Sequence, residues 1–277
     1  MDPFIITAVL SFGAFAGLIG TMLGLGGGVF MIIFFILALN IPAHQAVALS
    51  LLAVIASSSM GGSVYVRDKM TNVKLAMALE TCTVTGAVLG AFVAILMPVT
   101  FILVILGGVL FYASFMMLRG KRSEDIASEK DGRLSLCGEF YDVAKKCDVK
   151  YTTVRMKTGL FVSLVAGWIS GIVGIGGGVI MVPIMNIIMK IPMKATAATS
   201  NFMVGVTAAA SAFIYFNKGL VDLYMAVPTV IGIMIGAYIG TRIMVRVESL
   251  LLRRFLGVVL TFFAFVLLLK AGGILAW

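Results

Sequence analysis

The chain has 277 residues, of which 61% are hydrophobic and only 12% are charged, and its mean hydropathy is +1.13. Soluble domains carry about 25% charged residues, so this composition excludes a soluble globular protein. It predicts an all-α integral membrane protein, because continuous apolar runs cross a bilayer as helices. The net charge of +9 lies mainly in the polar stretches between these runs, which indicates membrane orientation rather than nucleic-acid binding.

Ten apolar segments follow one another along the chain, five in each half. We predict membrane helices at roughly 4–23, 29–39, 45–66, 75–97 and 100–118, and then at 158–173, 179–189, 195–216, 223–241 and 250–269. The second and seventh segments have eleven residues each. Eleven residues make about 16 Å of helix, whereas the hydrocarbon core is about 30 Å thick. These two segments are therefore predicted to be half-depth helices.

A glycine-rich break precedes each half-depth helix, at residues 24–28 and 174–178. Glycines interrupt the helix and free backbone N–H groups, which the bilayer tolerates only where the backbone is buried in protein or lines a wet cavity. Two such breaks at corresponding positions of two halves are typical of a transporter's binding site.

The two halves align without a gap at an offset of 150 residues, which indicates duplication. Five segments is an odd number, so the second half is predicted to enter the membrane inverted, with units 1–118 and 158–277 joined by a linker at 119–157. Matching glycines spaced four apart favour close helix packing. The matched pairs include Gly17/Gly167, Val29/Val179, Ser50/Ser200, Tyr65/Tyr215, Gly86/Gly236 and Gly90/Gly240.

The basic residues predict one orientation. Ten Lys and Arg lie in the 119–157 linker, and nine more lie in loops or at helix ends on the same predicted side, leaving only Lys218 and Lys270 on the other. Because cytoplasmic loops are enriched in Lys and Arg, we expect a cytoplasmic linker, both termini outside, and a multi-pass protein of the plasma membrane.

The linker itself allows two readings. Its mixed charges favour a solvated connection between the repeats. Apolar residues at helical spacing, namely Leu134, Leu136, Phe140 and Val143, are alternatively compatible with a weakly amphipathic helix on the membrane surface.

An anion site is predicted at the glycine breaks. The N–H groups at a helix start are electropositive and attract anions without a basic side chain. This assigns Gly26, Gly27 and Gly28 to the site together with their counterparts Gly176, Gly177 and Gly178, although glycines also serve simply for tight turns and packing. Hydroxyls at Ser50 and Ser200 and the amide of Asn201 follow the half-depth helices as candidate hydrogen-bonding groups, or as groups bonded to their own helix.

Glu80 is the one acidic residue within an apolar segment. An intramembrane carboxylate is a candidate for coupling transport to a proton. Its counterpart in the repeat is Val230, and it lies six residues after Lys74, so snorkelling toward the surface or pairing with a loop cation is the alternative.

The sequence resembles the TauE/SafE family of membrane transporters. The resemblance rests on the glycine breaks, each leading to an Ile-Pro pair and a serine, as in 24–28 with Ile41-Pro42 and Ser50, and in 174–178 with Ile191-Pro192 and Ser200. It implies transport of sulfur-containing anions such as sulfite, thiosulfate or organosulfonates.

We therefore expect a secondary transporter of a small sulfur-containing oxyanion or organosulfonate, working by alternating access and coupled to a proton or cation. The alternatives are an anion channel and a permease for carboxylates or other organic anions. With one histidine, His44, and three cysteines that lack metal-ligand spacing, no enzyme, metal or cofactor is expected.

Overall fold

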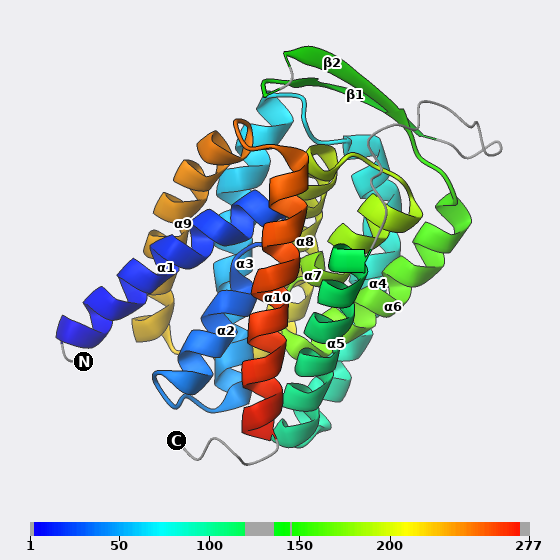
Figure 1. Cartoon of the computed structure of the whole chain (residues 1–277). Coiled ribbons are helices and arrows are strands. Elements are labelled where there is room, and N and C mark those ends of the chain that lie inside the picture. Colours follow the sequence, from blue (N-terminus) through cyan, green and yellow to red (C-terminus); the bar gives the residue numbers. More distant parts are fainter. Residues whose placement is uncertain (1–2, 120–135, 145, 272–277) are drawn as a thin grey trace.

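The computed structural model describes residues 3–119, 136–144 and 146–271 (Figure 1). Among them, eight helices are long and apolar enough to span a membrane, while α2 and the α7–η1 pair are shorter. The chain is thus a mainly helical multi-pass membrane protein. Its elements are α1 (Pro3–Leu23), α2 (Gly28–Leu37), α3 (Ala43–Arg67), α4 (Val73–Leu96), α5 (Val99–Arg119), β1 (Cys137–Asp142), β2 (Cys147–Thr152), α6 (Met156–Val173), α7 (Gly178–Pro183), η1 (Ile184–Ile188), α8 (Met193–Asn217), α9 (Leu223–Met244) and α10 (Ser249–Ala271).

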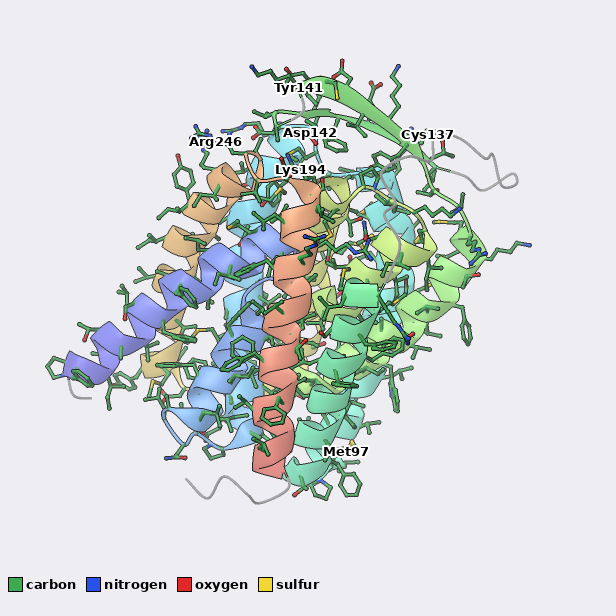
Figure 2. The ribbon with its side chains drawn as sticks, in the orientation of Figure 1. Met97, Cys137, Tyr141, Asp142, Lys194 and Arg246 are labelled. Atoms are coloured by element: carbon green, nitrogen blue, oxygen red, sulfur yellow. The ribbon has the colours of Figure 1, made fainter. Side chains whose placement is uncertain are left out.

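The bundle has two distinct ends. Strands β1 and β2 cover one end, while α1 begins and α10 ends near the other (Figure 1). Arg246 and Lys194 lie near the strands, and Met97, between α4 and α5, lies at the opposite end (Figure 2). Helix α1 runs toward the strands, and α2 turns back from the glycine break (Figure 1).

Glycines bring the outer helices into backbone contact. A Cβ on Gly86 or Gly90 of α4 would collide with the backbone of α6, and one on Gly236 or Gly240 of α9 would collide with the backbone of α1. The close packing predicted from the glycine spacing is confirmed. The partners are exchanged between the halves, because α4 and α9 correspond at the 150-residue offset, as do α6 and α1. The other long helices pack with their own counterparts, α3 with α8 and α5 with α10.

The two short helices differ from each other. Helix α2 is a regular α-helix of 10 residues, but its counterpart is α-helical only to Pro183 and continues as a π-helix at Ile184–Ile188. Proline has no backbone N–H and clashes with the preceding turn, so it disturbs the α-helical hydrogen bonds. The first half has Ile33 at this position. The short apolar helix predicted at 179–189 is thus present at Gly178–Ile188, but its second part is a π-helix.

The described part of the linker contains a β-hairpin, not an amphipathic helix. Strands β1 and β2 pair antiparallel from Cys137 opposite Thr152 to Asp142 opposite Cys147. Phe140 and Asp142 are buried while Glu139 and Tyr141 are exposed, which is the alternation of a strand rather than a helix. The helical reading of Leu136, Phe140 and Val143 is wrong, and Leu134 lies outside the described residues.

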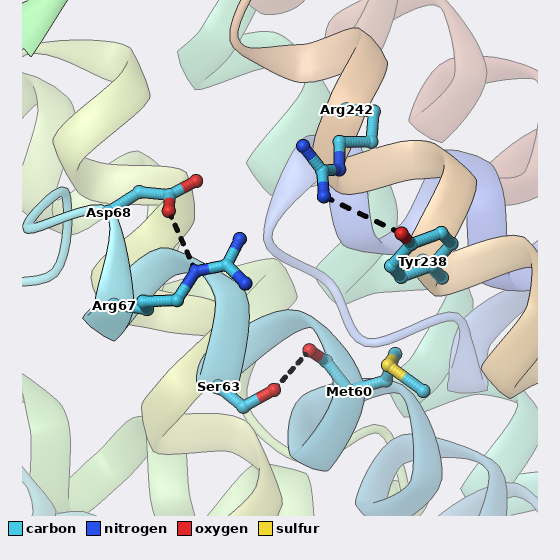
Figure 3. A network of polar contacts seen from close by, with 6 residues as sticks. All are labelled: Met60, Ser63, Arg67, Asp68, Tyr238 and Arg242. Carbon is cyan, nitrogen blue, oxygen red and sulfur yellow. Dashed lines mark hydrogen bonds and ion pairs between the residues drawn. The ribbon is translucent and has the colours of Figure 1, made fainter.

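Basic residues flank the bundle at the hairpin end. Arg67, at the end of α3, pairs with Asp68 at 3.1 Å, and Arg242 donates to the Tyr238 hydroxyl on α9 at 3.5 Å (Figure 3). On the exposed face of α3 the Ser63 hydroxyl donates to the Met60 carbonyl of its own helix (Figure 3). The cations and the hydroxyl here are therefore satisfied locally.

A buried ion pair fixes the hairpin to the bundle. Lys194 in the first turn of α8 is fully buried, and its Nζ lies 2.7 Å from Oδ1 of Asp142 and 3.0 Å from the Val245 carbonyl oxygen. From the sequence, Lys194 is interpreted as a loop cation that indicates the membrane orientation. In the structure it also attaches the hairpin to α8 from inside the bundle. Strand β2 leads on to Val154, whose N–H donates to the Met189 carbonyl after η1.

Asp142→Asn should destabilise the protein, because it leaves the buried Lys194 ammonium without its counter-charge. Removing one partner of a buried pair costs about 3–5 kcal/mol. Glu139→Gln is the matched control, since Glu139 pairs with Lys150 at 3.8 Å with both side chains largely exposed, and such pairs contribute at most about 1 kcal/mol. Thermal unfolding of the purified protein measures both, and equal shifts would contradict the anchoring role.

Candidate functional site

Both glycine breaks use backbone conformations that only glycine adopts easily. Gly24, Gly26 and Gly27 have φ of 75°, 73° and 73°, and their counterparts Gly174, Gly176 and Gly177 have 77°, 69° and 84°. Side chains with a Cβ rarely tolerate this left-handed region. The positive φ values turn the chain from α1 into α2, and from α6 into α7.

Two reciprocal hydrogen bonds join the breaks. The Ser50 hydroxyl on α3 donates to the Gly174 carbonyl of the second break at 2.8 Å and shares its hydrogen with the Val47 carbonyl of its own helix at 2.7 Å. The Ser200 hydroxyl on α8 donates to the Gly24 carbonyl of the first break at 2.8 Å. Both serines are fully buried. The serines thus satisfy carbonyl groups that the interrupted helices leave without an intrahelical partner.

The breaks also converge on one pair of valines. A Cβ built on Gly26 would lie 3.0 Å from Cγ1 of Val54, and one built on Gly176 would lie 2.7 Å from the same atom. Both would also contact Val204. The Ser57 hydroxyl reaches the first break and donates to the Gly26 carbonyl at 2.6 Å. The structure therefore brings both breaks together at the centre of the bundle.

The start of α7 has a different environment from the start of α2. A Cβ on Gly177 would contact only the Ser170 side chain, with 3.6 Å to Oγ. That hydroxyl is buried and has no hydrogen-bond partner. At the corresponding Gly27, a Cβ would lie 3.0 Å from the Ala16 carbonyl oxygen. The second break thus faces an unsatisfied hydroxyl, and the first faces packed backbone.

Asn201 is the most unusual of the predicted site residues. Its side chain is 0% exposed, and neither its amide nitrogen nor its amide oxygen has a hydrogen-bond partner. Its backbone carbonyl accepts a 2.5 Å hydrogen bond from Ser58 on α3. A buried polar group without a partner costs free energy, so this amide is the clearest candidate in the bundle for contacting a ligand.

Glu80 is buried against α8 rather than directed to the surface. It is 6% exposed, its Oε1 accepts a 2.7 Å hydrogen bond from the Thr207 hydroxyl, and its Oε2 has no partner. Thr207 also lies 3.4 Å from the Thr83 hydroxyl. Within the described part of the chain no ion pair of Glu80 with a cation is found. The snorkelling alternative is therefore wrong for this structure.

Thr21 and Gly61 were not assigned to the site from the sequence. Thr21 is fully buried with an unpartnered hydroxyl, and Gly61 packs against Asn201. A signal was present, because Thr21 and Gly61 differ from their repeat counterparts Gly171 and Ser211. Among the described residues no group of three His, Cys, Asp or Glu is placed to hold a metal.

The model of the sulfite exporter TauE/SafE family matches residues 9–267. The chain belongs to this family. The match covers all the long helices except the outermost residues of α1 and α10, and it contains both breaks, Asn201 and Glu80. The TauE/SafE protein described here is therefore a membrane transporter of that family.

Several relatives are similar to the chain along most of their length. The chain is 26% identical over 254 residues to the probable membrane transporter protein YunE of Bacillus subtilis, covering 89% of this chain and 90% of the relative. It is 25% identical to a probable membrane transporter protein of Xylella fastidiosa, covering 84% of each. It is 23% identical to the probable membrane transporter protein MJ0441 of Methanocaldococcus jannaschii, covering 89% and 90%. No solved structure matches the chain.

Ser50→Ala and Ser200→Ala should lower stability by similar amounts, because each leaves one buried carbonyl of the opposite break without its donor. The expected loss is about 0.5–1.5 kcal/mol for each. Ser59→Ala is the control, since Ser59 is exposed and donates within its own helix to the Ile55 carbonyl at 2.8 Å. Thermal melting measures the three variants, and a loss confined to one of the two buried serines would contradict a reciprocal role.

Proposed function

We propose that this TauE/SafE protein is a secondary transporter of a small sulfur-containing oxyanion or organosulfonate. The observation that carries the proposal is the unpartnered amide of Asn201, fully buried one residue from the serine that joins α8 to the first break. Transporters of this general design bind substrate near the bilayer midplane at breaks between repeats. The family's description supplies the sulfur-anion class.

The anion binds between the two breaks in this proposal. The starts of α2 and α7 contribute positive potential from their backbone N–H groups, and Asn201 contributes N–H donors. The remaining site residues are Gly26, Gly27, Gly28, Gly176, Gly177 and Gly178 with Ser50 and Ser200. Because both serine hydroxyls donate to carbonyls in this conformation, we infer that they reach the anion only in a conformation in which the breaks have separated.

Alternating access requires two halves that move relative to each other, and we propose that these are inverted repeats. The exchange of partners supports this, with α1 on α9 and α6 on α4. So do the reciprocal serine bonds, since a two-fold axis in the membrane plane would generate such pairs. Separation of the repeats would break both serine bonds together.

The hairpin end is proposed to face the cytoplasm. Arg246 lies near the strands (Figure 2), and the last turns of α3 and α9, which carry Arg67 and Arg242, reach the same end of the bundle (Figure 1). Cytoplasmic ends of membrane helices are enriched in such residues. The protein would then lie in the plasma membrane with both termini outside.

Native cysteines test this orientation. Cys137 and Cys147 on the hairpin are exposed, so in intact cells an impermeant thiol reagent should leave both unlabelled and should label them after permeabilisation. A cysteine introduced at Asn217, the last residue of α8, should be labelled in intact cells. The reverse pattern would invert the proposed orientation. Labelling of Asn217→Cys and the hairpin from the same side would contradict the inverted repeats.

Glu80 is proposed to carry the coupling proton. It is an ionisable group within a membrane segment, with a hydroxyl partner on α8, the helix that also carries Asn201. In proteoliposomes, we expect saturable sulfonate uptake that an imposed pH gradient accelerates. Glu80→Gln should abolish the acceleration and leave sulfonate binding measurable. Glu139→Gln on the exposed hairpin is the control and should behave as the wild type.

This assay also separates a transporter from a channel. Flux that rises linearly with sulfonate concentration and ignores the gradient in the wild type would identify an anion channel instead. An unchanged pH response in Glu80→Gln would remove Glu80 from coupling without affecting the rest of the proposal.

A further inference from the structure

Thr21, Asn201 and Gly61 lie together in a polar cluster beside the first glycine break. A Cβ built on Gly61 of α3 would collide with Nδ2 of Asn201 and would lie 2.6 Å from Cγ2 of Thr21. Glycine at this position thus makes room for the amide between α3 and α1. Thr21 is in the last turn of α1, and its carbonyl accepts from the Gly24 N–H at 3.3 Å. The cluster therefore lies next to the first break, where the anion site is proposed.

Among the described residues, this cluster contains three polar atoms without a hydrogen-bond partner. Asn201 and Thr21 are both 0% exposed, and Nδ2 and Oδ1 of Asn201 and Oγ1 of Thr21 all lack hydrogen-bond partners. Nearby groups are satisfied, because Ser58 donates to the Asn201 carbonyl and the Tyr65 hydroxyl donates to the Thr21 carbonyl at 3.2 Å. The unsatisfied atoms of the cluster thus belong to two side chains that both pack against Gly61.

Of the two corresponding places in the described repeats, one alone has this polar cluster. At the 150-residue offset the counterparts of Asn201, Thr21 and Gly61 are Leu51, Gly171 and Ser211. Leu51 is buried and apolar, and the Ser211 hydroxyl donates to the Thr207 carbonyl of its own helix at 3.2 Å. Packing symmetry therefore does not explain these polar atoms, because the three corresponding residues leave no side-chain polar atom unsatisfied.

The chemistry of the amide restricts the ligand. Whichever way the Asn201 side chain is turned, it presents one end that donates and one that only accepts. An anion with no hydrogen of its own can satisfy the N–H groups and the Thr21 hydroxyl, but it leaves the amide oxygen unpaired and facing negative charge. A ligand with both an acceptor and an O–H or N–H donor satisfies all three atoms.

We propose that this cluster opens as a pocket onto the anion site and selects anions that carry their own hydrogen-bond donor, an O–H or N–H group beside the charged oxygens. Thr21 and Asn201 are the specificity-determining residues, and Gly61 provides the space for the amide. The inference rests on the proposed anion transport and specifies which anions that site accepts.

The test compares anions that differ only in one group. Hydroxyethanesulfonate and propanesulfonate have the same charge and nearly the same shape, with a hydroxyl replacing a methyl group, and glycolate and propionate form the same contrast among carboxylates. Affinities are measured by calorimetry on the purified full chain. Wild type should prefer the hydroxyl member of a pair by roughly three- to tenfold, the scale of one added hydrogen bond. The preference should fall to about onefold in Thr21→Val and Asn201→Leu.

Thr241→Val is the matched control. Thr241 is equally buried, but its hydroxyl donates within its own helix to the Tyr238 carbonyl at 2.7 Å, so the variant should keep the preference and lose some stability. Thr21→Val and Asn201→Leu should instead melt at or above the wild-type temperature without ligand, because each replaces an unsatisfied buried group by an apolar one.

Each outcome decides between the two proposals. Sulfonate binding without preference would overturn the pocket's role and leave the transport proposal intact. Preference among carboxylates with no sulfonate binding would support the pocket and overturn the sulfur-anion class, while no binding of any of the four anions would overturn both. Lower melting temperatures in Thr21→Val and Asn201→Leu than in Thr241→Val would show that a structural water fills the pocket, and would overturn the inference.

Discussion

The structure depends on satisfying the backbone groups that the two glycine breaks expose inside an apolar bundle. No water is present in a bilayer core to bond them, so the protein must supply partners. It does so reciprocally, with Ser50 of α3 bonded to the second break and Ser200 of α8 bonded to the first. Each half thereby completes the break of the other. The central pair α3 and α8 is consequently tied to both breaks, and the remaining helices pack around it.

Helix α8 links the features on which the functional proposals rest. Ser200 binds the first break, the neighbouring Asn201 faces α1 and α3, and Thr207, further along, holds Glu80 of α4. Its first turn is anchored to the hairpin through Lys194. A displacement of α8 would therefore change the contacts of the anion site, the carboxylate and the hairpin at once. This connection gives a physical route by which substrate binding and protonation could be coupled through one rigid element.

Function is proposed where the two halves cease to match. The repeated residues build the frame, through the glycines with positive φ, the serine bonds and the tyrosines, whose hydroxyls each bond the end of a preceding helix. Asn201 and Glu80 are opposed by Leu51 and Val230 in the repeat. In the proposed transport cycle, a symmetric frame would let both halves adopt similar contacts in turn, and a chemically asymmetric site would bind one ligand in one orientation.

By itself, the sequence determined the membrane class, the ten apolar segments, the close packing at Gly86 and Gly236, and the family. It could do so because hydropathy, glycine spacing and a constant repeat offset can be read directly from the order of the residues. It did not determine the hairpin, since a short strand and an amphipathic helix compete within the same few apolar residues and the contact with α8 decides between them. Nor did it show that the Ser50 and Ser200 hydroxyls are hydrogen-bonded to the breaks, while the Asn201 amide has no partner among the described residues. Hydrogen-bond satisfaction depends on which helices meet across more than a hundred residues of chain, and only the tertiary structure decides that.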